Sequence, residues 1–416
     1  MRNLFDQYDA PENRLTHALG CCLDRDQRLL RSFVHWATDR PPPKGPIFVE
    51  EQHVPGTPLT DADQVEEKGL PDLWIHNGAQ WSLIVESKVG ARVNRSQLDR
   101  HRGTAERNGF SDVTLLVLAP EVSPRCPPGV LCRTWPEVYS WMRRQAGHSP
   151  WAVDMADYME VTEARMIADD YLGDKPLTRF DGIPFGSDHP YSYREAKRAL
   201  KLAMGELHKR ADLHRLGMDP DGAGRPAITG RDSTSVWDFL PLRAARDKAA
   251  FTACPHLTMG IQVQRVIIIV TLPNAVSAHM RQNVTDLGAD GFQKLLAEVQ
   301  GGVTKAIRSI KGAYPFLEII QRHYPSQRSA PILDACLEYD LRTAVASRNS
   351  SVKEQPQWAE ATFQALSDKR SNLQVGVGAA LPYGDPRIHS RDILDVIAGV
   401  WLGCRPWIRT ILGVVE

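Results

Sequence analysis

Residues 70–88 read LPDLWIHNGAQWSLIVESK, and this stretch decides the fold of the first half of the chain. Two runs of apolar, aromatic and β-branched residues flank the pair Asn77-Gly78, the strongest short sequence signal for a β-hairpin. The ionisable residues Asp72, Glu86 and Lys88 stand at the far ends of the two runs. We therefore expect a hairpin whose open end carries two acids and a lysine.

The length of the loop decides whether the two acids share a face, because side chains alternate along a strand. A two-residue turn would put Asp72 and Glu86 on opposite faces, whereas a three-residue loop over 77–79 puts them on the same face. We expect the three-residue loop, with Asp72 opposite Ile84 and diagonal to Glu86. Diagonal neighbours lie roughly 7–8 Å apart, close enough for two carboxylates to share one cation. The other face then carries Leu73, Ile75, Leu83 and Val85 toward the core.

These residue types suit the hydrolysis of a phosphodiester. The carboxylates of Asp72 and Glu86, with the backbone carbonyl of Ser87, form an oxygen site for Mg²⁺, for which Mn²⁺ can substitute. A divalent ion lowers the pKa of its water, and Lys88 on the same face can orient or deprotonate that water. The alternative is a surface ion pair between Glu86 and Lys88, but the presence of Pro71-Asp72 at the matching face favours a site.

Pro71-Asp72 followed by Glu86-Ser87-Lys88 resembles the motif of the PD-(D/E)xK nuclease superfamily. The resemblance implies a restriction-endonuclease-like α/β fold, with a mixed sheet flanked by helices. It also implies a preceding helix that bears another acid, and Glu12 matches that acid as a further metal ligand. Residues 94–101 resemble the Gln-x-x-x-Tyr helix of the exonuclease-like branch. There Gln97 matches the glutamine that positions a phosphate or the water, and His101 replaces the tyrosine.

With 416 residues the chain is long for one core, so we expect two domains, 1–171 and 172–416. In the first domain we expect helices over 11–23, 27–37, 96–109, 135–145 and 152–171, and strands over 47–54, 113–119 and 130–134 beside the hairpin. A Gly-, Pro- and Asp-rich linker over 172–191 leads to a C-terminal α+β domain. That domain has expected helices over 192–216, 292–311 (interrupted at Gly301-Gly302) and 393–402, and strands over 235–240, 256–263, 266–272 and 372–381. Its expected role is target recognition, oligomerisation or regulation.

The formal net charge is zero, with 50 basic and 50 acidic residues, so contacts with DNA must come from local patches. The basic residues expected to contact nucleic acid are Arg95, Arg100, Arg194, Lys197, Arg198 and Lys201. The last four lie on one face of the expected helix over 192–216. A solvated charged face is the alternative explanation for that pattern.

The seven cysteines include no Cys-x-x-Cys pair, so we expect neither a zinc ribbon nor a disulfide framework, and a reduced, cytoplasmic protein. We find no signal-peptide core, and the longest apolar run, around 266–270, is too short to span a bilayer, so no membrane association is expected. A structural role is assigned to His17, and His53 and His76 are not included in the site.

These features predict a Mg²⁺-dependent DNA nuclease, with an endonuclease favoured. By analogy with standalone bacterial members of the superfamily, it would be a restriction or phage-defence effector that acts as a homo-oligomer or with a partner defence protein. One alternative is a catalytically silent nuclease-fold module that binds nucleic acid or protein, and another is a nuclease that cuts RNA. The intact set of Asp72, Glu86 and Lys88 argues against the silent module.

Overall fold

The computed structural model describes residues 11–51, 71–89, 94–121, 126–169, 171–172, 175–225, 234–246, 251–326, 329, 331–344, 353, 355–367 and 372–414, with the side chains of residues 11, 12, 168 and 251 excepted. The chain folds into two compact units, Met1–Arg179 and Phe180–Glu416. The boundary lies after residue 179 rather than after 171, because Leu172 and Leu177 pack in the core of the first unit and Phe180 packs in that of the second.

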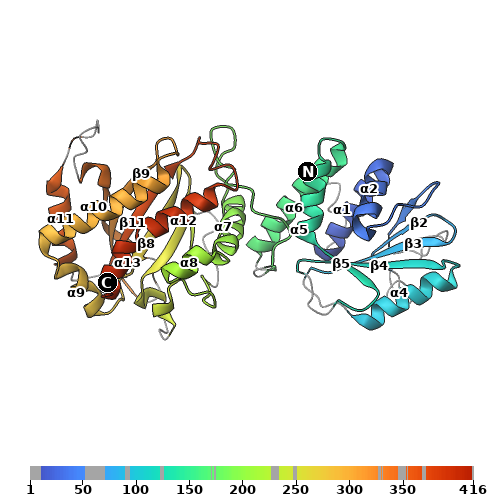
Figure 1. Cartoon of the computed structure of the whole chain (residues 1–416), viewed down its shortest axis with the longest axis horizontal. Helices are drawn as coiled ribbons and strands as arrows, with labels where there is room; N and C mark the ends of the chain where they lie inside the picture. The colour runs from blue at the N-terminus through green and yellow to red at the C-terminus, as the bar shows by residue number, and fades with distance from the viewer. Residues whose placement is uncertain are drawn as a thin grey trace. The chain divides into compact units, whose positions relative to one another are not determined.

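The first unit is built on a five-stranded mixed sheet (Figure 1). Its helices are α1 (Pro11–Arg25), α2 (Gln27–Thr38), α4 (Arg95–Arg107), α5 (Trp135–Gln145) and α6 (Pro150–Ala168). Its strands are β1 (Phe48–Glu50), β2 (Leu73–His76), β3 (Trp81–Ser87), β4 (Asp112–Ala119) and β5 (Val130–Thr134). The strands follow one another in chain order across the sheet, antiparallel from β1 to β3 and parallel from β3 to β5. The unit therefore belongs to the mixed α/β class.

Helices cover both faces of this sheet, as Figure 1 shows. Helices α1, α2, α5 and α6 form one core with the face that carries Leu73, Ile75, Leu83 and Val85, so the expected apolar face is confirmed. On the opposite face Leu98 and Ala105 of α4 pack against Trp74 and Ile84. The site residues of the hairpin therefore lie in a sheet that is buried on both sides.

Capping residues fix where three of these helices begin, because they bind amides that the first helical turn leaves unpaired. Asp26 accepts from the amides of Arg28 and Leu29 at the start of α2. Asn94 accepts from the Ser96 amide at 3.0 Å at the start of α4. Thr134 forms a capping box at the start of α5. The three helices accordingly begin within one residue of the expected positions.

One disulfide corrects the expectation of reduced cysteines. Cys126 and Cys132 are bonded, with their Cα atoms 6.5 Å apart. Cys132 lies on β5, and the chain just before this strand turns through Gly129, which has a φ of 76°. This local turn brings Cys126 back to the strand at a spacing that no common cysteine motif marks. The remaining cysteines are free thiols.

The second unit combines helices with a six-stranded sheet in which all pairs are antiparallel. Its strands are β6 (Ser235–Pro241), β7 (His256–Gln262), β8 (Arg265–Leu272), β9 (Tyr314–His323), β10 (Ile332–Asp340) and β11 (Asn372–Pro382), in the order β10-β9-β11-β8-β7-β6. Its helices are α7 (Tyr193–His208), α8 (Ala211–Leu216), α9 (Ala278–Thr285), α10 (Gly288–Ile307), α11 (Pro356–Ser367), α12 (Ile393–Gly403) and α13 (Arg405–Leu412), with short 3₁₀ turns at Arg243–Ala245, Phe251–Ala253 and Leu341–Thr343. Its large apolar core lies between the sheet and helices that include α7, α10 and α12.

Two helices of this unit differ from the prediction. The expected helix over 192–216 is broken into α7 and α8 at Arg210, whose backbone is extended and whose guanidinium bonds Asp212 and Asp395. Helix α10, in contrast, runs uninterrupted through Gly301-Gly302. A Cβ atom on Gly302 would lie 2.7 Å from the carbonyl oxygen of Gly403, so this glycine permits close packing of α10 on α12. In the part of the chain that the structure describes, no helix is both long and apolar enough to cross a bilayer.

Candidate active site

The register of the β2–β3 hairpin sets the geometry of the site. It pairs Leu73 with Val85 and Trp74 with Ile84. Continued by one residue, the same register puts Asp72 across from Glu86, so the predicted pairing of Asp72 with Ile84 is wrong by two residues. Because Asp72 and Glu86 are directly opposite each other in this register, their side chains lie on the same face of the sheet. Directly opposite residues are closer together than the diagonal neighbours that the sequence predicted.

The side chain of Asn77 explains this register. Its Oδ1 accepts hydrogen bonds from the amides of Ala79 at 3.0 Å and Trp81 at 3.1 Å. The backbone N–H of Asn77 donates to the carbonyl oxygen of Trp81 at 3.2 Å. Asn77 and Trp81 therefore form the last hydrogen-bonded pair of the hairpin. The three-residue loop covers 78–80, and Gly78 in it has a φ of 69°. The Asn-Gly pair predicts the turn correctly but does not reveal which residue begins it.

The backbone of Ser87 holds Asp72 at the end of β3. The Ser87 amide donates a hydrogen bond of 2.8 Å to Oδ2 of Asp72, which is half-buried. The next amide, that of Lys88, donates to the carbonyl of Leu118 on β4 at 2.7 Å. The hydroxyl of Ser87 is buried and has no hydrogen-bond partner among the described residues. Such an orphaned group fits a site that binds a polar ligand or water.

Two donors enclose the carboxylate of Glu86, which is only 1% exposed. Nζ of Lys88 lies 2.5 Å from Oε1, and Nε2 of His101 lies 2.9 Å from Oε2. Burial by itself raises the pKa of Glu86, but the hydrogen bond from His101 and the charge of Lys88 outweigh it and hold the pKa below its usual range. Glu86 is therefore ionised at neutral pH, as a metal ligand must be.

His101, which replaces the tyrosine of the Gln-x-x-x-Tyr pattern and was not among the predicted site residues, contacts Glu86. It lies on α4, is 1% exposed and donates to Glu86. The available signal was its spacing from Gln97, because residues four apart occupy one face of a helix. Gln97 itself is half-buried in the first turn of α4. Glu12 lies in the first turn of α1, and its side chain is outside the described part of the structure, as is the whole of His53.

The basic residues fall into exposed and buried groups. On α4, Arg95 is 3.9 Å from Asp99 and is exposed, as is Arg100. On α7, Arg194 is exposed and Lys201 is half-buried, but Lys197 and Arg198 are only 6% and 8% exposed. The continuous exposed basic face expected there is therefore wrong, because two of its four members are enclosed by the second unit.

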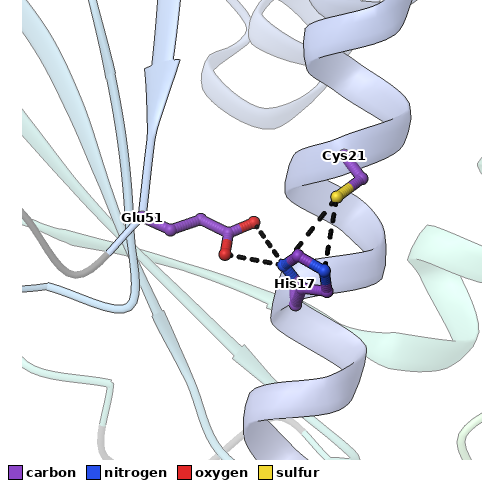
Figure 2. Close-up of side chains that lie close together, drawn as sticks. All are labelled: His17, Cys21 and Glu51. Carbon is purple, nitrogen blue, oxygen red and sulfur yellow. Dashed lines mark hydrogen bonds and ion pairs between the residues drawn. The ribbon is translucent and has the colours of Figure 1, made fainter. Parts of the chain in front are cut away.

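A second cluster joins three side chains that are not among the predicted site residues (Figure 2). Nδ1 of His17 lies 2.7 Å and 3.0 Å from the two carboxylate oxygens of Glu51. Sγ of Cys21 lies 3.5 Å from Nε2 of the same histidine. Burial, with a smaller effect from Glu51, raises the pKa of Cys21 to about 11. The pairing of His17 with Glu51 spans 34 residues, so no local pattern announces it.

No protein-family model matches the chain, and no curated protein matches it in sequence. Its function is therefore inferred from its residues and their geometry.

Proposed function

We propose that this protein is a divalent-metal-dependent nuclease that hydrolyses DNA phosphodiester bonds, and that the first unit carries the active site. One observation carries the proposal: Asp72, the buried Glu86 and Lys88 converge at one end of a hairpin, with the Ser87 amide bonded to Asp72. Two acids and a lysine brought together in an enclosed setting are more than a surface ion pair needs. An endonuclease is favoured, and a role in restriction or phage defence follows by analogy only.

The donor set fits Mg²⁺ or Mn²⁺. Asp72 and Glu86 offer carboxylate oxygens, Ser87 offers its carbonyl, and these hard oxygen donors are the ligands that Mg²⁺ prefers. Glu86 can accept from His101 through Oε2 while Oε1 binds a cation, because each carboxylate oxygen has two lone pairs. A bound divalent ion would supply an activated water and neutralise charge on the scissile phosphate.

Lys88 and His101 have different roles in this proposal. The ammonium of Lys88 contacts Oε1 of Glu86 at 2.5 Å, so it must release this oxygen before Glu86 can ligate a cation. As an ammonium, Lys88 is then placed to orient the attacking water and to balance the negative charge that grows on the phosphate, and it must first lose its own proton if it is to accept one from that water. His101 contacts the carboxylate of Glu86, and we assign it as a positioning residue that fixes the orientation of this acid.

The fold adds support. A mixed sheet flanked by helices is what the resemblance to the PD-(D/E)xK superfamily implies, and the first unit has such a sheet. Helix α1 precedes the hairpin and bears Glu12 in its first turn, the position that the resemblance assigns to a further acidic ligand.

The experiment is a cleavage assay on supercoiled plasmid, linear duplex DNA, single-stranded DNA and RNA, with Mg²⁺, Mn²⁺ or EDTA. Asp72→Ala and Lys88→Ala are compared with wild type, and Asp112→Ala and Lys44→Ala serve as exposed controls of the same residue types. We expect metal-dependent cutting of DNA, reduced by about 100-fold or more in both site variants, since positioned acid–base groups contribute that much. The two controls should cut like wild type.

Each result separates the proposal from its alternatives. Cutting of RNA but not DNA would retain the site and change the substrate. Cutting that survives in both site variants would place the chemistry elsewhere. If no substrate is cut, calorimetric titration of wild type and Asp72→Ala with Mg²⁺ decides: absence of binding to wild type would make the fold a silent module and overturn the proposal.

A further inference from the structure

Helix α1 and the residue that follows β1 together present a mixed set of metal ligands. His17 and Cys21 are four residues apart on α1, so they project from the same face of the helix. Glu51 comes directly after β1 and points its carboxylate at His17, as Figure 2 shows. One ligand atom from each of the three residues can be chosen so that all lie within 4.8 Å of one another.

The distances suit a tetrahedral ion. With Zn–S near 2.3 Å and Zn–N near 2.0 Å, two ligands of a tetrahedral zinc lie about 3.5 Å apart. Sγ of Cys21 is 3.5 Å from Nε2 and 3.8 Å from Nδ1 of His17, so that edge of the tetrahedron is already formed. The edge between His17 and Glu51 is shorter, 2.7 Å, which is the length of a hydrogen bond. A shift of less than an ångström would open it.

The local backbone makes room for the Glu51 carboxylate. A Cβ atom on Gly20 would lie 2.6 Å from Oε1 of Glu51 and 2.8 Å from a methyl carbon of Leu73. A residue with a side chain at position 20 would therefore push Glu51 away from His17. An acid, an imidazole and a thiol are thus brought together beside a helix position that only glycine fills without displacement.

We propose that His17, Cys21 and Glu51 form a binding site for Zn²⁺ or a similar transition-metal ion, separate from the oxygen site of Asp72 and Glu86. Three protein ligands with a water in the fourth position complete a tetrahedral shell. The imidazole and thiolate favour zinc over Mg²⁺, which prefers oxygen. The thiol must lose its proton to bind, so metal uptake releases a proton. A bound ion would fasten α1 to the end of β1.

The test uses the full chain, freed of any affinity tag and stripped with a chelator, then titrated with Zn²⁺ in competition with a coloured chelator and separately with Co²⁺. We expect one zinc bound per chain, and a cobalt spectrum with the intense visible bands of tetrahedral coordination and a near-ultraviolet thiolate-to-cobalt band. Mg²⁺ in excess should not displace the zinc. Circular dichroism checks the fold of every variant.

Matched variants assign the ligands. Cys21→Ser should abolish the thiolate band and weaken zinc binding by at least about 100-fold, the upper end of the cost of changing a residue that only hydrogen-bonds a metal ligand. Cys336→Ser, at an exposed free thiol in the second unit, should leave both unchanged. His17→Ala should also lose binding, with the exposed His148→Ala as its control. Cys21→Ala provides a second variant should the serine disturb folding.

Three outcomes would overturn the proposal. The first is a wild-type chain that takes up no zinc or cobalt. The second is cobalt binding without a thiolate band, and the third is binding that persists undiminished in both Cys21 variants. Because none of these readouts depends on cleavage, the proposal stands or falls independently of the nuclease activity.

Discussion

The imidazole of His101 on α4 donates a 2.9 Å hydrogen bond to the carboxylate of Glu86 on β3, and both residues are only 1% exposed. This contact connects the helix that covers one face of the sheet to the acid at the centre of the candidate site. A buried hydrogen bond to an ionised acceptor is stronger than a neutral one. It therefore bears on stability as well as on the orientation of Glu86.

We predict that His101→Ala lowers the free energy of unfolding by roughly 1–3 kcal/mol, because it leaves a buried acceptor without its donor. Urea unfolding of the purified chain measures the change. Arg100→Ala, at the exposed neighbouring position, should stay within about 0.5 kcal/mol of wild type. His101→Gln, which keeps a donor, should recover part of the loss. Equal stability of His101→Ala and Arg100→Ala would show that the contact contributes nothing.

The charge of Glu86 predicts a pH dependence of stability. Its pKa in the folded chain is lowered, so its ionised form contributes stability above the usual glutamate pKa of about 4.3, and this is lost as the pH falls through the lower folded value. Glu86→Gln does not titrate. Below about pH 4, wild type should therefore lose unfolding free energy relative to Glu86→Gln.

The measurement is a series of urea titrations from about pH 7 down to about pH 3, a range that spans the usual glutamate pKa. Glu106→Gln, at an exposed position on the same helix as His101, is the matched control, and its own pH dependence is subtracted. A difference for Glu86→Gln that stays flat over the whole range would mean that Glu86 is not held ionised by His101 and Lys88.

The sequence predicts the local parts of this site better than the distant ones. The hairpin, its apolar face and the strand Val130–Thr134 follow from alternation and turn residues, which act over a few positions. The register of the hairpin does not, because it depends on how the Asn77 side chain folds onto the turn. The same limit applies to His101 and Glu86, which meet only after α4 packs on the sheet.

The second unit shows a different limit. Strand β10 lies at an edge of its sheet, and most of its residues, including Ile332 and Leu333, are exposed. An edge strand that is exposed on both sides has no alternation of apolar and polar residues, so hydrophobic periodicity misses it. For Lys197 and Arg198 the error is the reverse, because these residues were expected to be exposed and are buried. Their charge suggests an exposed face, but α7 packs both of them into the unit.

Two glycines in helix interiors should respond differently to alanine. Alanine favours a helix over glycine by up to about 1 kcal/mol. Gly205 on α7 is exposed and has open space around it, so Gly205→Ala should stabilise the chain by about 0.5–1 kcal/mol. Gly20→Ala should show no such gain, because the added methyl group meets Glu51 and Leu73. Thermal unfolding of both variants tests this, and an equal gain at Gly20 would mean that Glu51 moves aside without cost.

The disulfide between Cys126 and Cys132 should stabilise the first unit through the loop that it closes. The two cysteines are six residues apart, and the chain-entropy relation gives about 2 kcal/mol for so short a loop. We predict that a thiol reductant lowers the unfolding free energy by that amount.

The double variant Cys126→Ser with Cys132→Ser should start at the lower value and not respond to reductant. Cys336→Ser, at an exposed free thiol, should respond as wild type does. Should the reductant leave the wild-type chain unchanged while a maleimide label reports that both thiols are free, the bond would contribute no stability.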